Sequence, residues 1–527
     1  MSRISRYRRD YPSAYQSLST QLQQGNFLKT TAIKILIELG GVGFLSKAPV
    51  IGQILRTSEG LLAGHIADAQ MLEASAALKT QDITSYVEKL LPKILEVDVL
   101  IVGSGPGAAV AAEIEIKSSK KSVCVLERGA PPRTPSELHH SLTHVINDFF
   151  QGGQELVVAS GLPLYAQGSV IGGGSEVNSG LFHNLPELYR EDWSKSFGIS
   201  VEEWLKSESL TAGQLVPEAM KVSPSDSLLA RGAENDNLVC GNIPRWRSYQ
   251  RDGSYIHRGM NLIFWNTKEA RERITFFQNS DAIKVDASNQ SFVEVTVKNS
   301  KSGLTSKIRA QRVHIAGGAI STTNLLAKSG LIRWRDTKFS WHPMIRIVAK
   351  SRRSDLGAGD IDPFQAWTPD RSLKFGSAVS TAPLLSVALG RLVSLEEAAG
   401  LRSYYVSFSS SGRGGILPIL GLPWYLFSKK DFSLAKQGLE ILKKVISQGG
   451  GVIVNPEKVN AKKFSTVHIF GTLPISSGVF VAGTNQLKSD QRIRVSDASI
   501  LPFGPGVNPQ GVVMSSVRIA NRDLEIS

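Results

Sequence analysis

The chain has 527 residues, of which 42% are hydrophobic and 20% charged, and its formal net charge is +14. These fractions are ordinary for a soluble globular protein, and the length favours two domains over one. A basic surface suits an anionic ligand or membrane, but no nucleic-acid recognition motif accompanies it, so we expect no nucleic-acid partner. Two cysteines are too few for a disulfide framework or a metal cluster, and we expect no metal site.

Residues 1–95 have the pattern of a helical leader without a catalytic motif, with helices expected over 57–81 and from residue 82 to about 92. The basic run 3–9 is either a frayed, solvated terminus or an anchor at an anionic membrane surface. No apolar run follows it, which argues against an export signal. Charged residues interrupt the apolar stretch 31–55, so it is too short to span a bilayer. We expect a cytoplasmic protein, with peripheral membrane contact as an open alternative.

A strand, a glycine-rich turn and a helix follow one another from residue 98. The strand 98–102 leads into Gly103-x-Gly105-x-x-Ala108. In such a loop the first glycine makes a tight turn, the second lets the backbone approach a pyrophosphate, and the small third residue lets helix and strand pack closely. The helix N-terminus offers N–H groups to the phosphates. A second strand ends in Glu127, whose carboxylate can accept ribose hydroxyls. The unit predicts a bound dinucleotide without distinguishing FAD from NAD.

The rest of the chain alternates between helical and strand patterns. Residues 183–240 are largely helical and polar, and alternating runs between 274 and 318 predict strands. In the mixed segment that follows, we expect strands near 345–350 and 404–410 and a helix over 432–448.

Three further segments, together with the nucleotide loop, resemble the glucose–methanol–choline (GMC) family of flavin oxidoreductases. They are GSVIGGGSEVNSGLFHNLPELYREDW (168–193), VHIAGGAISTTNLLAKSGL (313–331), and the stretch from VHIFGT at 467 to VSDASILPFGPGVNPQGVVMSSVRIANR at 495–522. The resemblance covers about 98–193, 310–350 and 467–527.

The resemblance implies an α/β fold, α+β overall, in which a Rossmann-like FAD-binding domain is built from discontinuous segments. We expect that domain to comprise 96–193, 276–332 and 466–527, after the helical leader. A substrate-binding domain of a sheet with helices would then comprise 194–275 and 333–465.

The resemblance also implies how FAD is held. In some family members a histidine just before the equivalent of Asn178 bonds covalently to the flavin. Val177 takes that place here, so we expect non-covalent FAD. A carboxylate near the ribityl chain and a helix N-terminus directed at the flavin N1/O2 side are further expectations. The residues assigned to the cofactor are Gly103, Gly105, Pro106, Gly107, Ala108, Glu127, Gly173, Gly174, Ser175, Asn178, Gly317, Asp497, Ala498, Asn508 and Pro509.

Oxidation of an alcohol requires a base for the hydroxyl proton and an acceptor for the hydride, and a bound flavin provides the acceptor. His468 in VHIFGT matches the active-site histidine of the family, and Asn508 matches its second catalytic position, which is histidine or asparagine. We expect His468 to act as general base while Asn508 holds the same oxygen. His342, in a histidine-proline element, is interpreted as structural.

The sequence gives less information about the substrate than about the cofactor. The segment 412–430 contains an apolar run, which is a buried core segment, a wall or lid over an apolar substrate, or a membrane-dipping loop. The last two interpretations favour a lipid-like, terpenoid or steroid alcohol over a sugar. The reoxidant is open: oxygen, a quinone or a redox protein. Two other functions also stay open, a lyase or decarboxylase of the same fold and a non-catalytic FAD-binding subunit of a complex.

Overall fold

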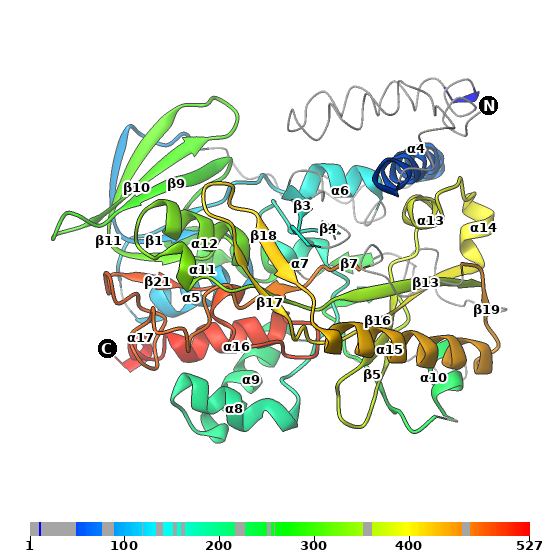
Figure 1. Ribbon diagram of the computed structural model, residues 1–527. Helices are drawn as coiled ribbons and strands as arrows, with labels where there is room; N and C mark the ends of the chain where they lie inside the picture. The colour runs from blue at the N-terminus through cyan, green and yellow to red at the C-terminus, as the bar shows by residue number, and fades with distance from the viewer. Residues whose placement is uncertain are drawn as a thin grey trace.

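The computed structural model describes residues 10–11, 49–75, 89–118, 120–132, 141–150, 155–159, 164–216, 227–234, 236–249, 255–257, 259–350, 361–455 and 464–526. Of the helix expected from residue 82 to about 92, only residues 89–92 lie within these ranges, and they are not helical; the apolar stretch 31–48 lies outside them. Two large sheets organise the described chain, and helices surround them (Figure 1). The fold is mixed α/β, as expected.

The first sheet has seven strands in the order β8-β2-β1-β11-β10-β9, with β21 also beside β11. Its strands are β1 (Ile94–Val102), β2 (Val123–Leu126), β8 (Ile274–Phe277), β9 (Ser280–Asp286), β10 (Val293–Asn299), β11 (Thr305–Ile315) and β21 (Ile493–Val495). The strands β8, β2, β1, β11 and β21 are parallel, whereas β9 and β10 form an antiparallel meander on β11. The strands predicted between 274 and 318 are therefore confirmed. β1 begins at Ile94, earlier than predicted and inside the leader expected to be helical.

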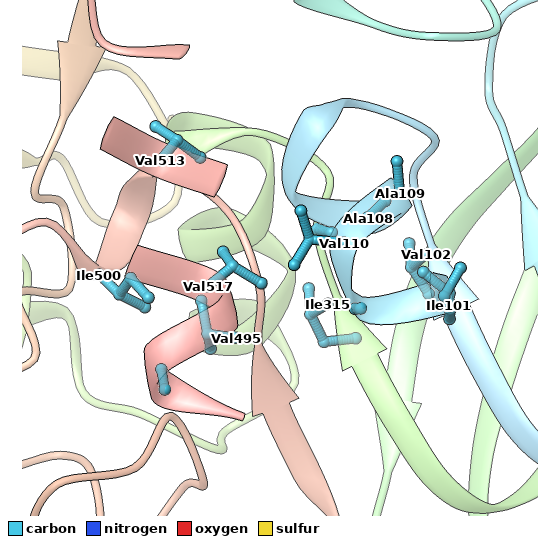
Figure 2. Close-up of a cluster of buried hydrophobic side chains, with 14 of the residues drawn as sticks. Ile101, Val102, Ala108, Ala109, Val110, Ile315, Val495, Ile500, Val513 and Val517 are labelled. Carbon is cyan, nitrogen blue, oxygen red and sulfur yellow. The ribbon is translucent and has the colours of Figure 1, made fainter. Parts of the chain in front are cut away.

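Helix α5 (Pro106–Ser118) packs on the parallel strands, and α16 (Gln510–Ala520) packs on α5. Small side chains on α5 make this possible, since Ala108 to Ala112 are fully buried. Figure 2 shows Val110 of α5 and Val517 of α16 beside Ile315 and Val495, at the ends of two neighbouring strands. Segments that are far apart in the sequence thus share one core under the glycine-rich loop.

The second sheet is antiparallel, with the strand order β19-β13-β16-β15-β14-β5. Its strands are β5 (Val239–Asn242), β13 (Met344–Lys350), β14 (Phe364–Trp367), β15 (Lys374–Ala378), β16 (Leu401–Ser407) and β19 (Val452–Ile453). Helix α15 (Lys429–Gln448) covers one side, where Ile345 and Ile347 of β13 share a buried cluster with Leu442. Because side chains alternate along a strand, Met344 and Arg346 point to the opposite side. The predictions for β13, β16 and α15 are confirmed.

Shorter elements complete the fold. The helices are α4 (Pro49–Ser75), α6 (Leu142–Asp148), α7 (Gly174–Val177), α8 (Glu187–Phe197), α9 (Val201–Leu215), α10 (Leu228–Ala233), α11 (Lys268–Arg273), α12 (Ala319–Lys328), α13 (Ala382–Leu389), α14 (Leu395–Ala399), α17 (Asp523–Ile526), the π-helix η5 (Asn261–Trp265) and the 3-10 helices η6 (Trp334–Asp336) and η8 (Ala498–Ile500). The small strand pairs are β3 (Glu155–Leu156) with β4 (Leu164–Tyr165), β6 (Arg247–Tyr249) with β7 (Tyr255–His257), β12 (Ser340–Trp341) with β20 (Ile469–Phe470), and β17 (Arg413–Ile416) with β18 (Pro423–Leu426).

Helix α4 belongs to the leader and lies against α6 and α13 (Figure 1). Two glycines permit the close approach, since a Cβ added to Gly60 would lie 2.8 Å from the backbone oxygen of Val387, and one added to Gly64 would lie 2.8 Å from its Cγ2. The buried Asp68 accepts hydrogen bonds from the backbone N–H groups of Leu142 and Thr143, where α6 begins. Within the described ranges, no helix combines the length and the apolar character that crossing a bilayer requires.

The glycines of the nucleotide loop have different surroundings. Gly103 has a φ of +102°, and a Cβ there would lie 2.2 Å from the backbone oxygen of Ala316. A Cβ on Gly107 would lie 2.2 Å from the backbone oxygen of Ser496. A Cβ on Gly105 would meet no atom within 4 Å. Two of the glycines therefore allow chain segments to touch, and Gly105 faces open space.

This difference predicts unequal losses of stability for two similar substitutions. Gly107→Val should lower the free energy of unfolding by about 3 kcal/mol, the upper range for overpacked cores, because backbone must move to admit the side chain. Gly105→Val should change it by less than about 0.5 kcal/mol, as at an open surface position. Chemical denaturation measures both, and equal losses in the two variants would contradict the assignment.

Gly105→Val should nevertheless purify without bound flavin, because its side chain would occupy the space expected for the pyrophosphate. Gly213→Val is the matched control, since a Cβ at this exposed glycine of α9 also meets no atom within 4 Å. Its flavin absorbance should equal that of the unmodified protein.

Candidate active site

A cavity of about 1070 Å³ lies between the carboxyl ends of the parallel strands and the open side of the second sheet. This volume is at the upper end of the ~300–1,000 Å³ typical of ligand pockets. The predicted site residues that line it are Gly103, Gly105, Pro106, Gly107, Glu127, Gly173, Gly174, Asn178, Gly317, His468, Asp497, Ala498, Asn508 and Pro509. Ala108 and Ser175 lie behind the lining: Ala108 is buried in the core, and the Ser175 hydroxyl accepts from the backbone N–H of Met260. The structure thus brings nearly all of the predicted set to one cavity.

Glu127 lies at the end of β2 and is almost fully buried. One carboxylate oxygen accepts from the backbone N–H of Ser104 at 3.0 Å and from its hydroxyl at 2.6 Å, and the other accepts from the backbone N–H of Gly129 at 2.7 Å. Burial raises the pKa of Glu127, although these hydrogen bonds oppose that effect. A carboxylate has about four acceptor positions, so capacity remains for a ribose hydroxyl.

Ser104 is a site residue that the sequence analysis did not single out. Besides bonding to Glu127, its hydroxyl accepts from the backbone N–H of Gly172 at 2.9 Å, and its backbone oxygen accepts from the indole N–H of Trp265 at 2.8 Å. It therefore joins the nucleotide loop to the second glycine run, residues 172–174. The only signal in the sequence was a hydroxyl residue between Gly103 and Gly105, which by itself does not indicate its partners.

Asp497 is fully engaged by the protein. One oxygen accepts from the backbone N–H and hydroxyl of Ser499, at 2.8 and 2.5 Å. The other accepts from the backbone N–H of Gly318 at 2.9 Å and the hydroxyl of Thr322 at 2.5 Å. These bonds fasten the turn before α12 to the C-terminal segment and occupy the usual acceptor positions. A bond from Asp497 to a ribityl hydroxyl stays a prediction.

The surroundings of the second glycine run fit a flat, extended cofactor. A Cβ on Gly174 would meet no atom within 4 Å, as at Gly105, so both glycines border open cavity. Asn178 donates to Oε1 of Gln510 at 2.6 Å, which places it beside the first turn of α16. The N-terminal N–H groups of that helix are available to an anionic partner. The described residues contain no group of three or more histidine, cysteine or acidic side chains placed to hold a metal ion.

His468 and His342 lie side by side at the other end of the cavity. Their Nδ1 atoms are 3.4 Å apart, and the backbone N–H of His342 donates to the backbone oxygen of His468. His468 lines the cavity, whereas His342 is buried behind it. Burial lowers the pKa of His468 well below its ordinary value. Its neighbours His342, Lys374, His183 and Arg346 lower it further. The imidazole is therefore unprotonated at neutral pH and can accept a proton.

Asn508 is held by a lysine that the sequence analysis missed. Lys374 of β15 is buried, and its Nζ donates to Oδ1 of Asn508. Burial lowers the pKa of Lys374 to about 7. The sequence around this residue, RSLKFGSA, has no motif that marks it, because its partner is distant in the chain.

The segment 412–430 forms the hairpin of β17 and β18, whose two parts have different environments. Ile416 and Tyr425 in its stem are buried, which supports the core interpretation for that part. At its tip, residues 420–422 line the cavity, and Ile419 and Leu420 are 89% and 67% exposed. The tip is therefore a wall of the cavity rather than core.

Apolar side chains form much of the remaining wall at this end. They come from α13, from the hairpin tip and from the segment before His468, and are Leu384, Leu385, Val387, Leu420, Leu422 and Val467. Helix α4 lies behind α13 and supports this wall from outside.

Comparison with known proteins gives consistent relatives. A family model described as GMC oxidoreductase matches residues 146–344. An uncharacterized GMC-type oxidoreductase of Sinorhizobium fredii is 25% identical over 509 residues, covering 82% of this chain and 95% of the relative. The long-chain-alcohol oxidase FAO1 of Arabidopsis thaliana is 26% identical over 300 residues, covering 52% of this chain and 39% of the relative.

Among solved structures, pyridoxine 4-oxidase from Mesorbium loti matches with a TM-score of 0.64 and 16% identity, covering 81% of this chain and 98% of that one. At this identity the likeness shows the fold alone. Family model, near full-length relative and shared fold agree with the glycine-lined cavity: they support a GMC-type oxidoreductase, a family whose members are FAD flavoproteins that act on alcohols, and the chain is an oxidoreductase.

Proposed function

We propose that this protein oxidises an alcohol to a carbonyl with non-covalently bound FAD, holding the carbinol between His468 and Asn508. The observation that carries the proposal is that these two side chains, from separate segments, line one cavity together with the glycine loop. FAD, when bound, supplies the acceptor for the hydride that leaves the carbinol carbon.

The chain offers groups for each part of the cofactor. The N-terminus of α5 and the open faces of Gly105 and Gly174 suit a pyrophosphate, and Glu127 suits the ribose. Val177 lines the cavity and has no side-chain atom that could bond to a flavin. We therefore propose non-covalent binding.

His468 accepts the hydroxyl proton. Its Nε2 has no hydrogen-bond partner among the described residues, and its Nδ1 faces His342. If His468 donates from Nδ1 to His342, its Nε2 carries no proton and is free to act as the base. His342 is then a positioning residue that keeps the catalytic imidazole in this tautomer.

Asn508 donates to the same alcohol oxygen. The ammonium of Lys374 has donors only, so in this form it orients the Asn508 amide with its oxygen toward Lys374. The N–H groups of the amide are then directed away from Lys374, toward the cavity that Asn508 lines. They stabilise the negative charge that develops on the oxygen as the proton leaves.

The wall at this end favours an alcohol with an apolar body over a sugar. Its side chains are mainly aliphatic, and a sugar would leave its hydroxyls unpaired against them. The partial similarity to long-chain-alcohol oxidases supports the same choice. The reoxidant is not assigned.

His468→Ala should reduce kcat by about 10²–10⁴-fold, the range for loss of a general base, while flavin content is unchanged. Anaerobic mixing with a panel of apolar alcohols and hexoses, followed by flavin bleaching, measures this. Bleaching by hexoses alone would contradict the substrate class. A protein with bound flavin that no alcohol reduces would instead support a lyase, a decarboxylase or a non-catalytic subunit.

The pH profile gives a second test of the base. A base with a lowered pKa stays unprotonated at more acid pH, so protonation of His468 should lower kcat/KM only below pH 6.5. An acid limb centred above 6.5 would contradict the assignment of His468.

Lys374→Met should reduce kcat by about 10-fold or more, less than the ~10²–10³ found on deleting an oxyanion donor outright, because Asn508 would lose its fixed orientation. In an Asn508→Ala background the same change should cost little, since the two residues act as a unit. Lys350→Met, at an exposed lysine on β13, is the control. Equal losses with and without Asn508 would show that Lys374 acts in another way.

We also propose that the exposed hairpin tip contacts anionic membranes, as its apolar side chains and the net charge of +14 favour. Ile419→Asp should reduce co-sedimentation with phosphatidylserine vesicles several-fold. Ile419 has a φ of +65°, which aspartate tolerates better, so the fold should persist. Leu304→Asp changes another exposed leucine, on the β10–β11 turn, and should have no effect; equal binding by all three proteins would refute the proposal.

A further inference from the structure

The open side of the second sheet carries a cation inside the substrate end of the cavity. Arg346 of β13 and Tyr405 of β16 are direct partners in the strand ladder, and both line the cavity. Tyr405 lies outside the segments that resemble the family, and the mechanism above gives neither residue a contact with the substrate.

The hydrogen bonds of Arg346 leave its charge uncompensated. Its guanidinium donates to the hydroxyl of Ser465 and lies 3.7 Å from the sulfur of Met344. No carboxylate among the described residues pairs with it. Burial lowers the pKa of Arg346, which means that the enclosure of its charge is unfavourable without a partner.

The hydroxyl of Tyr405 lies over Gly376 of β15 and beside Gln365 of β14, on the side of β16 away from β13 and Arg346. Oε1 of Gln365 is 2.8 Å from Nε2 of His183, so the amide N–H₂ of Gln365 is left to donate to the Tyr405 oxygen at 3.3 Å. The phenol oxygen thus acts as an acceptor, and its own O–H hydrogen has no acceptor among the described residues. Arg346 is therefore the charged group of this part of the lining, and its guanidinium presents donors only.

The acidic residues of the cavity lie elsewhere in its lining. They are Glu127, Glu155, Asp281 and Asp497, which belong to the first sheet, to β3 and to the C-terminal segment. The lining contributed by the second sheet contains no carboxylate. The pyrophosphate of the cofactor is expected at the N-terminus of α5, so it is not the partner of Arg346.

We propose that Arg346 forms a carboxylate-binding subsite, and that the preferred substrates are hydroxy acids with an apolar body. A guanidinium matches a carboxylate with two parallel hydrogen bonds, which gives both affinity and orientation. The subsite rests on the proposed function, and it adds a polar anchor to an otherwise aliphatic wall.

Turnover of three matched compounds tests the subsite: a hydroxy acid, its methyl ester, and the alkanol of the same length. The wild-type protein should use the acid with a kcat/KM at least 10-fold above the ester. Arg346→Met should lower kcat/KM for the acid by about 30–100-fold, as for loss of a charged hydrogen-bonded pair, and for the ester by less than 3-fold. Equal use of acid and ester, or equal losses for both, would overturn the proposal.

Binding of the alkanoate without a hydroxyl group separates this proposal from the proposed function. The compound should raise the thermal midpoint of the wild-type holoprotein and of an exposed control, Arg335→Met, but not of Arg346→Met. If the Arg346-dependent shift occurs while no alcohol reduces the flavin, the subsite stands and the alcohol oxidation fails. If neither the wild-type protein nor any of the variants shows the shift, the proposed subsite is wrong. Arg346→Lys keeps the charge but not the planar fork, and it should give an intermediate shift. It also serves as a control for a folding defect in Arg346→Met.

Discussion

Close backbone contact at the nucleotide loop is the constraint on which the rest of the structure depends. Gly103 lies against the backbone of Ala316, and Gly107 lies against that of Ser496, so three distant segments meet within contact distance. Side chains at either glycine would separate them. Asp497 then fastens the same junction with hydrogen bonds to Gly318 and Thr322. Because of this junction the C-terminal segment reaches the cavity, and with it come the histidine and the asparagine on which the proposed chemistry depends.

The two ends of the cavity have contrasting electrostatic character. The loop end offers glycine backbone and helix N-termini, with buried carboxylates already bonded to protein donors. The end formed by the second sheet contains histidines, Lys374 and Arg346, and its strands contribute no carboxylate to the lining. Burial, and then the positive surroundings, keep His468 unprotonated, and these surroundings favour negative charge on a bound oxygen. The same surroundings fit an anionic group on the substrate.

Much of the fold could be predicted because its signals are local. The alternation in β9 to β11, the spacing of apolar residues in α15, and the sequence of strand, glycine turn and helix at β1 and α5 all lie within short windows. Boundaries were less accurate, since β1 extends to Ile94 through pairing with β11 rather than through its own composition. The hairpin of β17 and β18 was read as one apolar run, because the division between buried stem and exposed tip depends on neighbours such as Asn324, which donates to the Gly421 backbone.

The sequence by itself determined the cofactor loop, the carboxylate at the end of β2 and the residues that the family resemblance assigns to the chemistry, because these occur in motifs of fixed spacing. The tertiary structure decided which of them meet and what holds them. The bond from Ser104 to Gly172 joins residues 68 positions apart, and the bond from Lys374 to Asn508 joins residues 134 apart. Arg346 is a candidate for binding because no carboxylate of the described residues pairs with it. Such pairings depend on burial and on long-range contact, for which a single sequence contains no periodic signal.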